Sequence, residues 1–204
     1  AREKGFHTLK GHEKGREHFE DFLEWCREKG VQVVTVYGFS TENWNRSKEE
    51  VDYLMNLFET YLGGKKFIER FQKEGVRMRV IGQKKRLKPS LQKVIANIEE
   101  VTKNNTNLIV NLAVSYGGRW DVLQAVQKII QSGVSAELVT EETIESNLET
   151  AGLPEPDLII RPGGQQRLSN LLLWQAAYSE LYFSPTYWPD FSKQDFEDAL
   201  LEYA

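Results

Sequence analysis

The feature that most constrains the fold of this chain is a regular alternation of β-branched apolar segments with amphipathic helical segments. Residues 31–37, 76–81, 108–114 and 157–161 are short, mostly apolar and rich in Val or Ile, as buried strands are. The segments between them repeat apolar residues every three or four positions, which indicates helices with one buried face. Because parallel strands need such long crossovers, this order predicts a single α/β domain over residues 1–204, with a central, mostly parallel β-sheet covered by helices.

Capping residues and glycines mark where the expected helices begin and end. Ser47 is placed to cap a helix, with Glu50 three residues further on, and Gly30 and Gly75 each follow the end of one. The sequence predicts helices at 12–29, 47–62, 65–73, 91–101, 122–130, 140–148, 171–178 and near 196–200, and a further short strand at 181–183.

Composition and charge exclude several classes of protein. The chain holds 26 Lys+Arg and 30 Asp+Glu, a net charge of -4, which argues against a general nucleic-acid binder. Cys26 is the only cysteine, so no intrachain disulfide framework or CxxC zinc site exists, as in proteins of reducing compartments. No apolar run approaches the roughly 18 residues that span a bilayer. The sequence therefore predicts a cytoplasmic protein with no nucleic-acid partner.

Three polar loops directly follow predicted strands, at residues 38–46, 115–119 and 161–170. In parallel α/β sheets, ligands bind beyond the carboxyl ends of the strands. We therefore expect the functional site of the protein to be built from these three loops.

The loop 161–170, RPGGQQRLSN, combines two arginines, two glycines and a serine. Arg161 and Arg167 can bind phosphate oxygens in bidentate fashion, and Ser169 adds a hydroxyl near the start of the next predicted helix. Gly163 and Gly164 allow the backbone to approach a ligand with its N–H groups exposed. The alternative is a Gly-rich turn with surface arginines, but the position after a strand favours an oxyanion or diphosphate site. The pattern is neither a P-loop nor GxGxxG.

The loop 38–46, GFSTENWNR, mixes hydroxyls, amides, an arginine and a large aromatic residue. This mixture suits a ligand with a polar head beside an apolar body. The alternative is a capping turn whose Trp44 packs into the core.

Two further residues have a functional and an ordinary interpretation. His12 lies between Gly11 and the start of a helix, where an anion is favoured, but a single histidine is also common at a surface or a cap. Glu180 precedes an apolar segment and could hold Mg²⁺ together with a diphosphate, or be an ordinary charge at an element boundary.

Short segments along nearly the whole chain form one ordered pattern. They are Gly11-His12, 37–46 (YGFSTENWNR), 79–82 (RVIG), 116–119 (YGGR), 157–161 (DLIIR) with Gly163-Gly164, 167–175 (RLSNLLLWQ), 180–183 (ELYF) and Trp188-Pro189. Taken together, the segments resemble the cis-prenyltransferases, the undecaprenyl diphosphate synthase family. Each piece is weak alone, whereas the combination is highly specific.

The resemblance implies a homodimer with a hydrophobic tunnel beside the sheet. It also implies a Mg²⁺-dependent condensation of isopentenyl diphosphate with an allylic diphosphate, giving a Z-polyprenyl diphosphate. By this likeness Asn43 is catalytic and assists proton removal from the isopentenyl unit, and Glu180 is a magnesium ligand. The substrate-binding residues that it implies are His12, Ser40, Thr41, Glu42, Trp44, Arg46, Arg161, Arg167, Leu168 and Ser169.

A helical stripe of apolar residues is the candidate wall of the implied tunnel. The stripe consists of Val51, Leu54, Phe58 and Leu62. The same pattern is also what ordinary core packing produces, so both interpretations stay open.

The sequence departs from the family pattern in several places. Family members begin with a strand and an Asp-Gly-Asn segment whose aspartate binds Mg²⁺, and they usually continue into a basic tail with an Arg-x-Gly element. Residues 1–204 contain neither, so we expect this polypeptide on its own to be nearly inactive. Thr8, Pro162 and Gln165 stand where relatives usually have an arginine, a small hydroxyl residue and a glutamate.

Several alternatives to a chain-elongating enzyme stay open. One is an enzyme of the same fold that joins isoprenoid units irregularly, head to middle. Another is a non-catalytic partner subunit, whose hallmark is the loss of Asn43, Arg161 and Arg167; all three are present. An unrelated α/β phosphate-binding domain is the third. Because long products are lipids, peripheral membrane contact is the most that we expect.

Overall fold

The centre of the protein is built from parallel strands. The computed structural model describes residues 8–204, and for residues 8–14, 16 and 17 it describes the backbone alone. One sheet has the order β1 (Val33–Ser40), β3 (Leu108–Tyr116), β2 (Val76–Ile81), and a second pairs β4 (Leu158–Pro162) with β5 (Glu180–Ser184). Every pairing in these two sheets is parallel.

The predicted α/β class and its parallel strands are therefore confirmed, with one difference in the sheet. The strands divide between a three-stranded and a two-stranded sheet, because β1 and β4 each pair with only one neighbour among the described residues. β3 lies between β1 and β2, with Val33 opposite Ile109 and Val76 opposite Leu108.

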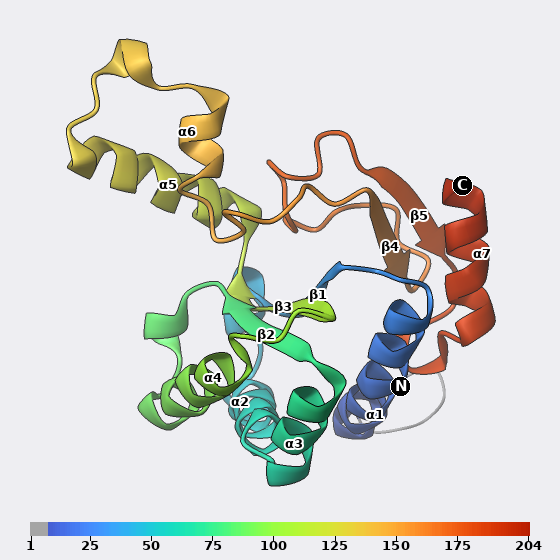
Figure 1. Cartoon of the computed structure of the whole chain (residues 1–204). Helices are drawn as coiled ribbons and strands as arrows, with labels where there is room; N and C mark the ends of the chain where they lie inside the picture. Colours follow the sequence, from blue (N-terminus) through green and yellow to red (C-terminus); the bar gives the residue numbers. More distant parts are fainter. Residues whose placement is uncertain (1–7) are drawn as a thin grey trace.

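Helices cover these sheets from several sides (Figure 1). They are α1 (Thr8–Glu28), α2 (Lys48–Leu62), α3 (Lys65–Glu74), α4 (Pro89–Thr102), α5 (Gly118–Ser132), α6 (Glu141–Glu145) and α7 (Lys193–Tyr203). α2, α3 and α4 lie together on one side of the three-stranded sheet, α7 lies beside β5, and α5 and α6 project away from the body of the molecule. No helix within residues 8–204 is long and apolar enough to cross a membrane.

The core forms where helical apolar stripes meet β3. Leu91 and Ile98 of α4 are fully buried, as are Leu108 and Val110 of β3. Spacings of three, four and seven residues place such side chains on one face of a helix, so the periodicity of α4 determines which face packs on the sheet. The predicted cap of α2 is also present, since the side-chain oxygen of Ser47 accepts the N–H of Glu50 at 3.3 Å.

The apolar stripe of α2 contributes to this core. Val51, Leu54 and Leu62 are all at least nine-tenths buried, and Phe58 packs against the same cluster. The ring of Phe58 also approaches Gly38, where an added Cβ would lie 3.1 Å from it. The core-packing interpretation of the stripe is thus correct for this structure, and the tunnel stays a prediction.

Residues 171–178 form successive turns, so the helix predicted there was wrong. The backbone explains the difference, because Ser169, Asn170 and Leu172 have φ angles of 52°, 64° and 44°. A right-handed helix requires negative φ at every residue. The apolar pattern arises instead because Leu172 and Ala176 point into the interior from a chain of turns.

Candidate active site

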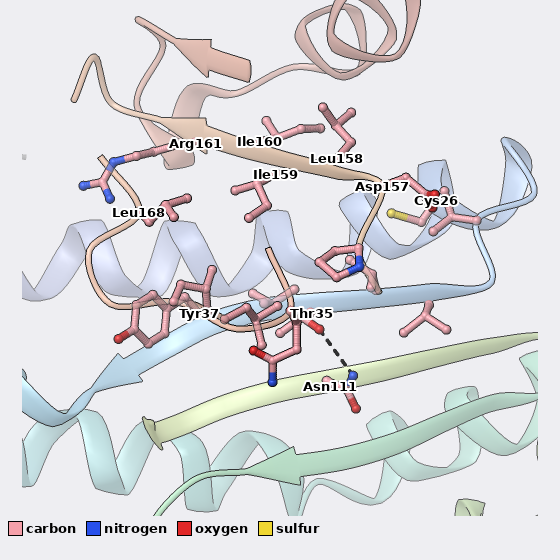
Figure 2. Close-up of a pocket in the computed structure, with 18 of the residues that line it drawn as sticks. Cys26, Thr35, Tyr37, Asn111, Asp157, Leu158, Ile159, Ile160, Arg161 and Leu168 are labelled. Carbon is pink, nitrogen blue, oxygen red and sulfur yellow. Dashed lines mark hydrogen bonds between the residues drawn. The ribbon is translucent and has the colours of Figure 1, made fainter. Parts of the chain in front are cut away.

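A large cavity lies between the two sheets, with β1 on one side and β4 on the other (Figure 2). Its volume is about 910 Å³, and residues 33–37 of β1 and 158–162 of β4 contribute most of its two long walls. Thr35 and Asn111 are hydrogen-bonded beside it, with 3.3 Å between the amide nitrogen and the hydroxyl oxygen. At the carboxyl ends of the strands the lining becomes polar. The polar residues there are Ser40, Asn43, Arg161, Arg167 and Ser169, and the apolar Leu168 lies among them.

Arg161 is the most constrained of these polar side chains. One terminal nitrogen, Nη1, donates to the carbonyl of Arg167 at 2.6 Å and to Oγ of Ser169 at 2.7 Å. Its Nε is buried and has no partner among the described residues. Burial, and then the positive charge of Arg167, lower the pKa of Arg161.

The two guanidinium groups therefore lie close to each other without a compensating carboxylate. Neither Arg161 nor Arg167 makes an ion pair within residues 18–204. Like charges held together with a buried N–H left over favour the binding of an anion with several oxygens. The oxyanion or diphosphate site predicted from the sequence stays a prediction, which this geometry supports.

The two glycines of this loop serve a different purpose from the one predicted. Gly163 and Gly164 have φ angles of 99° and 71°, which require glycine. Their N–H groups donate to the carbonyls of Thr186 and Ser184, both at 2.9 Å. The expectation of exposed backbone donors was therefore wrong, and the anion-binding capacity of the loop depends on side chains.

The loop after β1 forms a single short helical turn, η1 (Thr41–Asn45). The backbone N–H of Ser40 donates to Oδ1 of Asn43 at 3.0 Å, which fixes the orientation of the Asn43 amide at the edge of the cavity. The predicted catalytic residue Asn43 and the substrate-binding residue Ser40 thus share one cavity with the arginines.

Glu42 is held by hydrogen bonds on both carboxylate oxygens. Oε1 accepts Nδ2 of Asn170 at 2.9 Å, and Oε2 accepts the hydroxyl of Thr41 at 3.1 Å. Partial burial by itself raises the pKa of Glu42, but bonds from its own backbone N–H, Asn170, Ser40 and Thr41 outweigh it, so the pKa is lowered. The carboxylate is therefore ionised at neutral pH.

Trp44 and Arg46 of the same loop face other partners. The indole N–H of Trp44 donates to Oγ of Ser115 at 2.8 Å, and the guanidinium of Arg86 lies 4.6 Å from the indole ring. Trp44 packs against the core, as the alternative interpretation had it, and lines a second, smaller cavity. Arg46 is paired with Glu50 at 2.8 Å. Direct substrate contacts for these two residues stay predictions.

For two predicted site residues, the structure shows no place beside the arginines. The side chain of His12 lies outside the described part of the structure. Glu180 pairs with Leu158 at the beginning of the strands, whereas Arg161 pairs with Phe183 three residues further on, roughly 10 Å away along the strands. Among the described residues, no three potential metal ligands lie together.

Tyr37 is a site residue that the sequence did not reveal. Its hydroxyl donates to the carbonyl of Tyr116 at 3.1 Å and lies 3.4 Å from that of Ser169. The ring therefore links the ends of β1 and β3 to the arginine loop. A tyrosine at the end of an apolar strand carries no local signal for such a contact. Burial, and then the charge of Glu42, raise the pKa of Tyr37 to about 12.

Fold and site together define an α/β protein with a cavity whose end, beyond the carboxyl ends of parallel strands, carries two arginines without carboxylate partners in the described part of the chain. The family described as "Putative undecaprenyl diphosphate synthase" matches residues 1–204. The chain belongs to this family of cis-prenyltransferases.

Individual relatives support this assignment. The chain is 46% identical over 204 residues to an isoprenyl transferase of Aquifex pyrophilus, covering 100% of this chain and 87% of the relative. It is 43% identical over 207 residues to a geranylgeranyl-diphosphate-specific tritrans,polycis-undecaprenyl-diphosphate synthase of Thermoplasma acidophilum, covering 100% and 80%. The crystal structure of lavandulyl diphosphate synthase from Lavandula x intermedia, in complex with dimethylallyl diphosphate, superposes with a TM-score of 0.93. It is 34% identical, with 100% of this chain and 89% of that chain covered.

Replacing Tyr37 with phenylalanine tests whether its hydroxyl links the ends of β1 and β3 to the arginine loop. Tyr37→Phe is expected to lower the free energy of unfolding by about 1 kcal/mol, because it removes the hydroxyl bonded to the Tyr116 carbonyl. Urea unfolding at pH 7 measures this, with Tyr178→Phe, 92% exposed, as the matched control.

The pKa of Tyr37 predicts how the stability of the protein changes with pH in the alkaline range. Because the pKa of Tyr37 rises from 10.0 to about 12 on folding, its contribution is complete below pH 10 and is lost as the pH rises towards 12. The wild type should therefore lose more stability over this range than Tyr37→Phe. Equal losses would contradict the role of the hydroxyl.

Proposed function

We propose that this protein condenses isopentenyl diphosphate with an allylic diphosphate and releases a Z-polyprenyl diphosphate. The observation that carries the proposal is the pair Arg161 and Arg167, which lie without a carboxylate partner at the polar end of a cavity with apolar walls. A diphosphate supplies the missing negative charge, and family membership supplies the prenyl group. Irregular coupling of isoprenoid units by the same site remains the alternative, and product analysis distinguishes the two.

The reaction develops negative charge on the leaving diphosphate and removes a proton, and residues of this chain can act on both. A carbon–carbon bond forms while the allylic diphosphate leaves and the isopentenyl unit loses a proton. Arg161 and Arg167 hold one diphosphate, and the hydroxyl of Ser169 is oriented towards it by Nη1 of Arg161. Fixed positive charge in a preorganised site stabilises the negative charge that develops. Asn43, whose amide is oriented by the N–H of Ser40, assists the proton loss in this proposal.

We propose Mg²⁺ as the cofactor, with Glu180 as the ligand that this chain offers. The exposed carboxylate of Glu180 has the hard oxygen donors that Mg²⁺ prefers, and Mg²⁺ commonly binds with one or two carboxylates plus phosphate oxygens. When bound, the ion neutralises charge on a diphosphate. Glu180 does not lie beside the arginines of its own chain, so no step of the reaction is assigned to it.

We propose a cytoplasmic protein with at most peripheral membrane contact. The reasons are a lipid product and the lack of a membrane-crossing helix within residues 8–204. Any attachment then depends on surface contacts and not on a spanning segment.

We propose that the protein is a homodimer that associates through the projecting helix α5. Leu123, Val126 and Ile130 are 53%, 38% and 71% exposed, and their spacing places them on one face of this helix. Leu138, six residues after the end of the helix in the chain, is also exposed, at 69%. Exposed apolar patches of this kind mark protein contacts.

Sedimentation of the full-length protein tests the dimer. The wild type is expected to sediment as a dimer, and Ile130→Glu should shift it towards monomer because a charge is placed in the apolar contact. Lys128→Glu, on another face of the same helix, is the control. A monomeric wild type at assay concentration would overturn the proposed dimer.

The function is tested by incubating the full-length protein with labelled isopentenyl diphosphate, farnesyl diphosphate and Mg²⁺. Lengthening in five-carbon steps that EDTA abolishes is expected. A folded protein that incorporates no label with any allylic primer would refute the proposed reaction, and a branched product would identify irregular coupling.

Removing one guanidinium tests the diphosphate site. Arg161→Ala is expected to raise the KM for isopentenyl diphosphate at least about tenfold, because charge-assisted hydrogen bonds contribute roughly 1.5–3 kcal/mol each. Steady-state kinetics with the full-length enzyme measure this, with Lys65→Ala, an exposed charge on α3, as the control. An unchanged KM and turnover would remove Arg161 from the site.

A further inference from the structure

Asn170, the last residue of the loop 161–170, makes contact with both of the other loops at the ends of the strands. Its side-chain Nδ2 donates to Oε1 of Glu42 at 2.9 Å, and its Oδ1 accepts the backbone N–H of Arg119 at 2.9 Å. Its own backbone carbonyl accepts the N–H of Gly118 at 2.7 Å. One residue of the arginine loop is thus bonded to the loop after β1 and to the loop after β3.

The chemistry of these contacts requires an amide. Nδ2 faces a carboxylate that is ionised at neutral pH, so that position needs a donor. Oδ1 faces a backbone N–H, so the other position needs an acceptor. Asparagine provides both on one short side chain, whereas aspartate provides two acceptors and no donor.

The backbone around Asn170 is adapted to this arrangement. Its φ angle of 64° is in the left-handed region, which asparagine tolerates better than most residues. An added Cβ on Gly117 would lie 2.6 Å from Nδ2 of Asn170, so the turn after β3 approaches the amide closely. The preceding residue, Ser169, holds Arg161. The adjacent residues Ser169 and Asn170 are therefore bonded to the guanidinium of Arg161 and to the carboxylate of Glu42, respectively.

We propose that Asn170 is a positioning residue that holds the loop carrying Glu42 and Asn43 against the arginine loop. The inference rests on the proposed prenyl transfer, for which it names a residue that acts through others. Arg161 and Arg167 can still bind a diphosphate without the Asn170 amide, so its loss affects turnover more than substrate affinity.

Two substitutions separate the side chain from the backbone. Asn170→Gly keeps the positive φ and the carbonyl bonded to Gly118 but removes the amide. It is expected to lower kcat about 10- to 100-fold, with the KM for isopentenyl diphosphate changed less than about threefold, since misplaced groups cost turnover. Asn104→Gly, in an exposed turn, is the matched control. Asn170→Asp keeps one acceptor and places a second negative charge against Glu42.

A double-mutant cycle gives a result that a purely structural role does not. Asn170→Asp should cost at least about tenfold in kcat in the wild type and less than about threefold in the Glu42→Gln background, where the glutamine amide supplies the lost donor. Equal costs in the two backgrounds would overturn the inference.

Hydrogen exchange without substrate separates this inference from the proposed reaction. The Arg119 amide is expected to exchange faster in Asn170→Gly than in the wild type, because its acceptor is gone. If the wild type elongates prenyl chains and Asn170→Gly does so equally fast, the inference fails and the reaction stands. If the wild type makes no product, the reaction fails, and unchanged exchange of the Arg119 amide would overturn the inference as well.

Discussion

The parallel pairing of β3 with both β1 and β2 is the constraint on which the rest of the structure depends. Parallel strands end at the same edge of a sheet, so loops that are far apart in sequence emerge next to one another. Ser40 at the end of β1 pairs with Tyr116 at the end of β3, and Tyr37 and Asn170 then connect both ends to the arginine loop. The candidate site exists because the strands end at the same edge of the sheet.

Within residues 18–204, two arginines at that edge lie without the carboxylate partners that would stabilise their charge. Elsewhere in the described chain, Arg27, Arg46 and Arg70 have carboxylate partners, and Arg70 has two of them in Glu20 and Glu74. Arg161 and Arg167 have none in this part of the chain. Burial and then the positive charge of Arg167 lower the pKa of Arg161, and its Nε is buried without a hydrogen bond. Buried polar groups are normally satisfied, so such an exception calls for a functional explanation. The diphosphate of the proposed reaction is such an explanation.

The sequence predicted the strands and most helices well, because β-branched runs and helical periodicity are local signals. β2 begins and ends where it was expected, at Val76–Ile81. The prediction of a helix at 171–178 was wrong. In the sequence Leu172 fits an apolar helical face, whereas its positive φ depends on packing against residues far away in the chain. The arginines were found by their residue type. Tyr37 and Asn170 were missed because their roles depend on partners about 80 and 130 positions away in the chain.

The cavity between β1 and β4 has a consequence for the two sheets that flank it. Each of these strands pairs on one side only within residues 8–204, and both of them line the cavity. An unpaired strand edge is a template on which a further strand can add. The free edge of β1 is therefore a place where another strand can extend the three-stranded sheet.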